Sequence, residues 1–127
     1  MPLTRISVPQ HLAPNQVRAL ADAVQTGLVS TCKVPADDCF QLVNWYEAGD
    51  MILNPTFGGV ERTKDASIVE ITLLQGRSDD QKRALYRSVT DLAVIAGFKA
   101  DDIMMGLIEN TAIDWTLGKG QSFQGHK

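Results

Sequence analysis

The sequence of 127 residues has few cysteines, few histidines and few aromatic side chains. Its two cysteines, Cys32 and Cys39, are not spaced as a Cys-x-x-Cys pair. We therefore expect both to be buried small side chains in a reducing, cytoplasmic compartment. The two histidines lie far apart, and no spacing of His, Cys, Asp and Glu indicates a metal site. We expect neither a metal nor another cofactor.

The sequence also has no excess of positive charge and no long apolar run. Twelve basic and 15 acidic residues give a net charge of −3, which argues against a nucleic-acid partner or an anionic membrane surface. No apolar run approaches the ~20 residues that span a bilayer. No basic segment followed by an apolar core begins the chain, so we expect no signal peptide.

A tandem repeat organises the chain. The stretches "ISVPQHLAPNQVRALADAV" (6–24) and "ITLLQGRSDDQKRALYRSV" (71–89) align at a shift of 65. Seven residues of the first stretch are identical to the residues 65 positions later: Ile6, Gln10, Gln16, Arg18, Ala19, Leu20 and Val24. Ala-Asp-Asp at 36–38 recurs at 100–102, at a shift of 64. Several identities in one order indicate a duplication.

Each copy has the pattern strand, helix, strand. In the first copy we expect strands over about 3–9 and 39–46 around a helix over about 14–31. Pro14 suits the first position of this helix. Apolar residues follow at helical spacing: Val17, Leu20, Val24 and Leu28.

The second copy repeats this pattern with clearer boundaries. The nearly unbroken apolar run 68–74 predicts a strand covered on both faces. Ser78 and Gln81 form a capping-box signature at the start of a helix, and Gly97 suits its end. The predicted buried stripe of this helix is Leu85, Val89, Leu92 and Ala96. The stretch "DIMMGLIE" (102–109) reads as the closing strand.

We therefore predict one α+β domain, in which a tandem β-α-β repeat forms a four-stranded sheet with two helices on one face. Its parts are repeat one (about 2–47), a connection (48–66), repeat two (67–110) and a C-terminal tail (111–127). The connection contains glycine turns and is either a hairpin or an extended segment.

Two groups near the strand ends of this fold carry candidate chemistry. Removal of Met1 would leave Pro2 with a free secondary amine, which can act as a general base or as a fixed cation. Only the first copy offers this amine, because Pro2 aligns with the internal Ser67. Arg77 follows the strand ending at Leu74, where ligands of such sheets bind, and could hold a carboxylate. Each residue also has a plain structural interpretation, as a chain start or a surface arginine.

Four further residues lie near these positions in the predicted fold. Gln75 points to the same side as Arg77 and could donate a hydrogen bond. Asp38 stands at the start of a strand, where it could position a proton or a water molecule, or simply form a turn. Trp115 and Leu117 could wall an apolar pocket or pin the tail to the core.

The combination of motifs resembles the tautomerase superfamily, and within it the malonate semialdehyde decarboxylase group. The matching stretches are "PL" (2–3), "VPADD" with "FQ" (34–41), "RSDDQK" (77–82) and "ENTAIDWTLGKG" (109–120), so the resemblance covers nearly the whole chain. It implies Pro2 as the amino-terminal catalyst, with Asp38 beside it. It also implies Arg77 as a catalytic arginine that holds the substrate carboxylate or polarises its carbonyl, Trp115 as a pocket wall and assembly as a homotrimer.

Two departures from the family pattern concern this site. The decarboxylase pattern has a second arginine at the position of Gln75, so the site has lost one cation. A neutral amide stabilises developing anionic charge less well. The family pattern has an aromatic residue two positions after Trp115. This sequence has Leu117 at that position, so we expect a roomier pocket. The dehalogenase branch has a glutamate at Trp115 and a histidine at Val29, so efficient dehalogenation is not expected.

The resemblance implies an enzyme without cofactor that decarboxylates a small 3-oxo acid such as malonate semialdehyde to acetaldehyde and CO2, with tautomerase or hydratase as a side activity. The alternative is a keto-enol tautomerase of 2-oxo acids such as phenylpyruvate. In the first case the Pro2 amine is cationic, and in the second it is neutral and moves a proton. A third alternative is a cytokine-like binding module, which retention of Met1 would favour.

Overall fold

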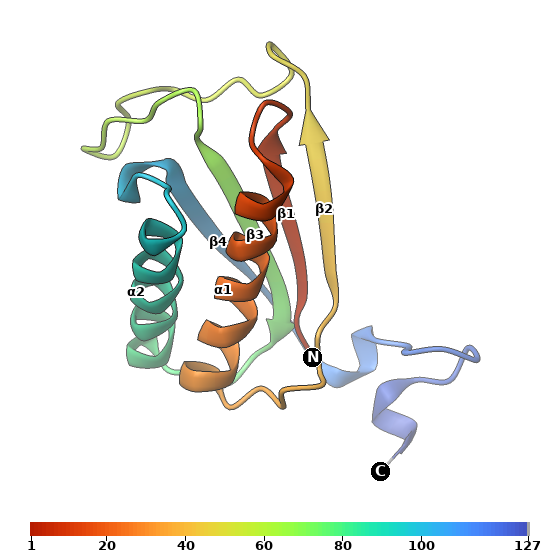
Figure 1. The fold of residues 1–127 in the computed structure, drawn as a ribbon. Coiled ribbons are helices and arrows are strands. Elements are labelled where there is room, and N and C mark those ends of the chain that lie inside the picture. The colour runs from red at the N-terminus through yellow and green to blue at the C-terminus, as the bar shows by residue number, and fades with distance from the viewer. Residues whose placement is uncertain (127) are drawn as a thin grey trace.

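The computed structural model describes residues 1–126. One four-stranded sheet forms the first layer and two helices form the second (Figure 1). The elements in chain order are β1 (Leu3–Pro9), α1 (Pro14–Cys32), β2 (Gln41–Tyr46), β3 (Ser67–Leu74), α2 (Asp79–Ile95) and β4 (Ile103–Asn110). The predicted fold class and the repeat of strand, helix and strand are confirmed.

The sheet has the order β2-β1-β3-β4, with each repeat contributing a parallel pair and the two repeats joined by the antiparallel pair β1 and β3. In this pair Arg5 lies opposite Glu70, its own counterpart at the repeat shift of 65. The register therefore relates the two repeats by an approximate two-fold axis through this pair.

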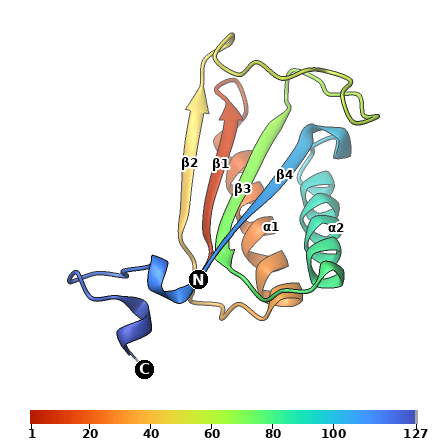
Figure 2. The same cartoon turned by 180° about the vertical axis from the view of Figure 1, so that it is seen from behind.

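This symmetry gives the sheet two ends of related architecture, at each of which two strands begin and the other two stop. We call each of these ends an edge. We call the edge where β1 and β2 begin and β3 and β4 end the N-terminal edge. The opposite edge is where β1 and β2 end and β3 and β4 begin. The N-terminus lies at the first of these edges, beside the start of β2 (Figures 1 and 2).

The core lies between the helices and the face of the sheet that they cover. Apolar side chains at alternate positions of β1 and β3 meet the apolar stripes of both helices. The predicted stripe of α1 is fully buried, at Val17, Leu20, Val24 and Leu28. The helices approach closely at Gly27, where an added Cβ would lie 2.9 Å from Val89 Cγ2.

The helix boundaries follow local sequence signals. Pro14 opens α1, as predicted. The hydroxyl of Ser78 accepts a hydrogen bond from the Gln81 N–H at 3.1 Å, and the Gln81 side chain accepts one from the Ser78 N–H at 2.9 Å. This is the predicted capping box. Gly97 follows the end of α2 with a φ of 101°, a conformation that favours glycine.

Several details differ from the sequence-based expectations. Strand β3 is covered on one face only, because both helices pack on the same side of the sheet and the other face carries the exposed Glu70. On α2, Ala93 is buried, whereas Leu92 and Ala96 are only half-buried, because they lie on the flank of the helix. Cys32 is buried but Cys39 is exposed, because Cys39 precedes β2 in an open loop.

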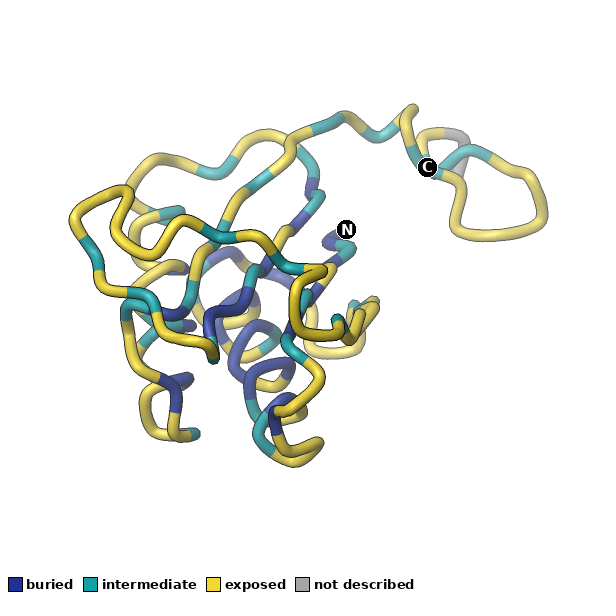
Figure 3. The backbone as a smooth tube through the Cα atoms, turned by 90° about the horizontal axis from the view of Figure 1, so that it is seen from above, coloured by how far each residue is buried: buried dark blue, intermediate teal, exposed yellow. Residues whose placement is uncertain are grey.

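The remaining segments lie outside the two layers. The connection 48–66 contains turns and no strand, and β2 begins at Gln41 instead of 39. The tail after β4 extends away from the sheet, and both it and the connection are largely exposed (Figures 1 and 3). Among the described residues, no helix is both long and apolar enough to cross a membrane.

Candidate active site at the N-terminal edge

The fold gathers five of the six predicted site residues at or next to the N-terminal edge. Pro2 precedes β1 and Asp38 precedes β2, while Gln75 and Arg77 follow β3 and Trp115 follows β4. Because β1 and β3 are antiparallel, the start of one strand meets the end of the other at this edge.

Asp38 lies beside the start of the chain. Its Oδ2 is 3.3 Å from the backbone amine of Met1, with side chains only 15% and 9% exposed, and Pro2 is buried. Oδ1 of Asp38 is also buried, and it has no hydrogen-bond partner within the described residues. A buried carboxylate oxygen without a donor is costly, so the position is suited to accept a hydrogen bond from a ligand or water.

The loop that carries Asp38 is tied to helix α1. The Asp38 N–H donates to the Pro35 carbonyl at 3.0 Å, and the Gln25 amide donates to the Asp38 carbonyl at 3.1 Å. The Gln41 side chain donates to the Ala21 carbonyl at 2.8 Å. These bonds hold the carboxylate at the chain start without using its own oxygens.

Arg77 is fixed against the end of helix α1. Its Nε and Nη2 donate to the Cys32 carbonyl at 3.3 and 3.1 Å, and Nη1 donates to the Leu74 carbonyl at 3.2 Å. A cation suits this place, because the last carbonyl groups of a helix carry partial negative charge. A guanidinium has five N–H donors, and these bonds use three, so two remain for an anion.

A small cavity adjoins Arg77. It has a volume of about 310 Å³ and is lined by Cys32, Lys33, Gln75, Gly76, Arg77 and Gln81. We call it the Arg77 cavity. Gln75 and Arg77 share it, as predicted from their spacing, but Pro2 and Asp38 are not among its lining residues. The single chain thus places an amine-carboxylate pair and a cationic cavity at the same edge.

Sequence reasoning missed Lys33 in this cavity. Lys33 ends helix α1 in the left-handed conformation, with a φ of 57°. Its ammonium has no partner in the described part of the chain, so the Arg77 cavity has a second cation despite the neutral Gln75. The only sequence signal was a lysine directly after a predicted helix, which is a common feature of helix ends.

Trp115 and Leu117 are placed differently from each other. Trp115 is half-buried, and its Nε1 donates to Asn110 Oδ1 at 2.8 Å. Asn110 also accepts a hydrogen bond from the Gln75 N–H at 2.8 Å through its carbonyl oxygen, which links Trp115 to the Gln75 strand end. Leu117 is 49% exposed on the projecting tail and is not brought to the Arg77 cavity.

Comparisons with known proteins agree with this architecture. The family model described as tautomerase enzyme matches residues 38–118. Two curated relatives from Bacillus subtilis (strain 168) are similar over 96% of this chain. The probable tautomerase YusQ is 29% identical over 97% of its length, and the probable tautomerase YrdN is 27% identical over 95% of its length.

Solved structures give the same result. The FG41 malonate semialdehyde decarboxylase inhibited by 3-bromopropiolate has a TM-score of 0.88 and 28% identity, over 94% of this chain and 91% of its own. Another malonate semialdehyde decarboxylase, described with decarboxylase and hydratase activities, has a TM-score of 0.89 and 28% identity over 98% and 97%. A fused 4-OT symmetric trimer shares the fold at a TM-score of 0.80 and 22% identity over 98% of both chains.

Proposed function

The chain belongs to the tautomerase enzyme family, and we propose that it decarboxylates a small 3-oxo acid such as malonate semialdehyde. The observation that carries the proposal is the Asp38 carboxylate beside the terminal amine, at the same edge as the Arg77 cavity. The likeness to two malonate semialdehyde decarboxylases over nearly the whole chain supports this chemistry.

The proposed catalyst is the amine of Pro2 after removal of Met1. The amine of Met1 now lies 3.3 Å from Asp38 Oδ2, and one residue less would place the secondary amine of Pro2 at the chain start. Pro2 is buried, so a substrate at this amine would be partly shielded from water. Asp38 would stabilise the ammonium form and use its unpaired Oδ1 to hold a substrate group or water.

The proposed substrate-binding residues lie in and beside the Arg77 cavity. The two unused N–H groups of Arg77 would bind the substrate carboxylate, and Lys33 would add a second positive charge. The Gln75 amide would donate a hydrogen bond to the carbonyl oxygen. Trp115 would form one wall, and Leu117 would reach the substrate only if the tail lies against another subunit.

The reaction breaks the bond between the carboxylate carbon and the adjacent methylene. The electron pair of this bond moves toward the carbonyl, which becomes an enolate held by the Pro2 ammonium, with Gln75 assisting. Carbon dioxide leaves, and a proton from the ammonium or from water converts the enolate to acetaldehyde. Alternatively, the neutral secondary amine of Pro2 condenses with the aldehyde to an iminium ion, with loss of water, and the iminium accepts the same electron pair to become an enamine. Protonation and hydrolysis of the enamine then release acetaldehyde and the free amine.

We also propose that the enzyme is a homotrimer. The sheet face not covered by the helices carries exposed apolar side chains, including Leu42, Met104 and Ile108, and the tail projects beyond the sheet. Apolar faces of this kind are usually buried in stable assemblies. A fused 4-OT of the same fold is a trimer. Sedimentation equilibrium on the purified chain tests this, and a monomer would contradict it.

Proton NMR of the purified protein with malonate semialdehyde tests the reaction. We expect acetaldehyde with the native protein and loss of its formation in Pro2→Ala, with Ser67→Ala, at the repeat counterpart, as the matched control. Intact mass should show that Met1 is absent. Acetaldehyde at the uncatalysed rate with native protein would contradict the decarboxylase proposal.

A tautomerase of 2-oxo acids is the second candidate. The neutral Gln75 favours it, because decarboxylation benefits from the strong cation that the residue replaces, and both curated relatives are named as probable tautomerases. Ketonisation of enol-phenylpyruvate measures this activity. Gln75→Arg should raise the ratio of the decarboxylation rate to the ketonisation rate. An unchanged ratio would show that Gln75 does not determine which reaction the enzyme favours.

A further inference from the structure

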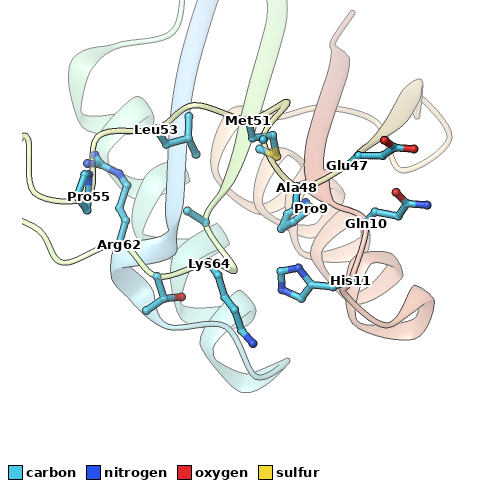
Figure 4. Close-up of a pocket in the computed structure, with 13 residues that line it drawn as sticks. Pro9, Gln10, His11, Glu47, Ala48, Met51, Leu53, Pro55, Arg62 and Lys64 are labelled. Carbon is cyan, nitrogen blue, oxygen red and sulfur yellow. The ribbon is translucent and has the colours of Figure 1, made fainter.

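A cavity larger than the Arg77 cavity lies at the opposite edge of the sheet, away from the candidate active site. Its volume is about 800 Å³, and its lining comes from the end of β1, the end of β2 and the connection that precedes β3 (Figure 4). We name it the Arg62 cavity. By the approximate two-fold symmetry of the repeats, this edge is the counterpart of the N-terminal edge.

The lining combines an apolar surface with positive charge. Pro9 at the end of β1 and Met51 and Leu53 in the connection supply apolar groups, and Arg62 and Lys64 supply the cations. The carboxylate of Glu47 lies on the side of the cavity away from both cations in Figure 4. Cavities with a mostly apolar lining and a few charged groups are typical sites for small organic ligands.

The two cations are free to meet an anion. Arg62 donates through Nη1 to the carbonyls of Asn54 and Phe57, both at 2.9 Å, which fixes the guanidinium without neutralising it. Lys64 has no bonding partner in residues 1–126. Neither cation forms an ion pair with a carboxylate within that part of the chain.

The remaining polar groups hold the cavity in shape. His11 Nε2 lies 2.6 Å from Asp65 Oδ1 and joins the segment after β1 to the segment before β3. The Arg62 N–H donates to the Pro55 carbonyl at 2.8 Å, which closes the loop around Arg62. The site is therefore built by contacts between segments that are distant in sequence.

The duplication explains why this cavity would bind without catalysing the reaction. Gln10 lines it at the position that corresponds to Gln75 in the Arg77 cavity. The counterpart of Pro2 is Ser67, which lies inside the chain and offers no amine. The counterpart of Asp38 is Asp102, whose two oxygens are both bonded to Thr63.

We propose that the Arg62 cavity is a second ligand site, which binds a small organic monocarboxylate with an apolar body. The free N–H groups of Arg62 would bind the carboxylate, and Met51 and Leu53 would contact the apolar part, whereas the Lys64 side chain points away from these two residues (Figure 4). The proposal does not depend on the reaction at the N-terminal edge, because no residue of the Arg77 cavity lines the Arg62 cavity.

Titration of the full chain with 4-phenylbutyrate, followed by 1H–15N NMR, tests the proposal. We expect shifts at the backbone amides of Gln10, Met51 and Lys64, at lower ligand concentration than any shifts at Lys33 or Gln75. Arg62→Gln should weaken this affinity about tenfold, as expected for loss of a charge-assisted contact, and Lys64→Gln should weaken it less. Lys119→Gln, on the tail, is the matched control and should leave the affinity unchanged.

Two outcomes would overturn the proposal. The first is a set of shifts confined to the Arg77 cavity, which would assign carboxylate binding to the candidate active site alone. The second is equal binding of 4-phenylbutyrate and its neutral amide, which would show that the cations of the Arg62 cavity do not recognise the charge. The NMR spectrum of each variant also reports whether that variant is folded.

Discussion

The two Ala-Asp-Asp turns of the repeat place chemically identical carboxylates in different surroundings. Asp102 is 2% exposed and accepts hydrogen bonds from the Thr63 N–H at 2.7 Å and from the Thr63 hydroxyl at 2.6 Å. Asp38, its counterpart, faces the terminal amine and keeps one buried oxygen without a donor. The difference arises because Thr63, in the segment before β3, donates to both oxygens of Asp102, whereas Asp38 lies beside the amine of Met1.

This comparison indicates how a duplicated unit can have one reactive site and one structural site. Where a segment covers the strand, it satisfies the aspartate, which then contributes to stability. In the first repeat, the counterpart aspartate keeps a buried oxygen that can accept a hydrogen bond from a bound molecule. Four predictions test or refine this interpretation.

The largest effect is expected for Asp38→Asn. We expect the rate of acetaldehyde formation to fall about 100-fold, because an amide neither stabilises an ammonium nor accepts its proton. We expect the midpoint of urea unfolding to change little, because the substitution removes the attraction between Oδ2 and the terminal amine but also the cost of the buried Oδ1 that has no donor among the described residues. A variant with normal rate would contradict the proposed role of Asp38.

The counterpart substitution Asp102→Ala should have the opposite result. It removes both acceptors of Thr63, including the one that its N–H meets at the buried Asp102, so we expect about 2 kcal/mol less free energy of unfolding. The rate per folded molecule should remain unchanged. Urea unfolding followed by circular dichroism measures the loss. Equal effects of the two aspartate substitutions on rate would contradict the division between a reactive and a structural edge.

A smaller effect is expected for the cations of the Arg77 cavity. Arg77→Lys should raise KM about tenfold, because a lysine cannot reproduce the bonds to two carbonyls and still bind a carboxylate with paired donors. Lys33→Gln should raise KM about threefold with little change in kcat, as for loss of one solvent-exposed charge. Lys99→Gln, near the opposite edge, is the control. An unchanged KM in Lys33→Gln would exclude Lys33 from substrate binding.

The smallest effect concerns the two helix starts, which are also repeat counterparts. Ser78 caps α2, whereas Ala13 at the same place before α1 makes no side-chain cap. Ser78→Ala should therefore lower the free energy of unfolding by about 1 kcal/mol, and Ala13→Ser should raise it by up to about 1 kcal/mol. Thermal unfolding by calorimetry measures both. A stabilising Ser78→Ala would contradict the capping account.

Much of the fold was predictable from local patterns. The repeat shift of 65 predicted two units of the same kind, and alternating or helical spacing of apolar residues predicted the elements within each. The capping box at Ser78 fixed the start of α2 to the residue, because cap and helix are adjacent in sequence. The spacing after the strand ending at Leu74 predicted that Gln75 and Arg77 point to the same side, and the family resemblance placed Asp38 beside Pro2.

The tertiary contacts of the polar residues were not predictable from local patterns. Asp38 and Asp102 lie in identical Ala-Asp-Asp turns, and the Thr63 that distinguishes them lies 39 residues from Asp102. Lys33 enters the Arg77 cavity because the end of α1 happens to pack against the end of β3. The Arg62 cavity forms from an irregular connection whose conformation has no periodic signal.

The sequence by itself thus determined the elements, their order and the duplication, because periodic spacing and helix caps act over a few neighbouring residues. Only the tertiary structure decided which aspartate remains without hydrogen-bond donors, which lysine joins Arg77, and where the larger cavity opens. Those outcomes depend on contacts between residues that are distant in sequence and become neighbours only when the two repeats pack together.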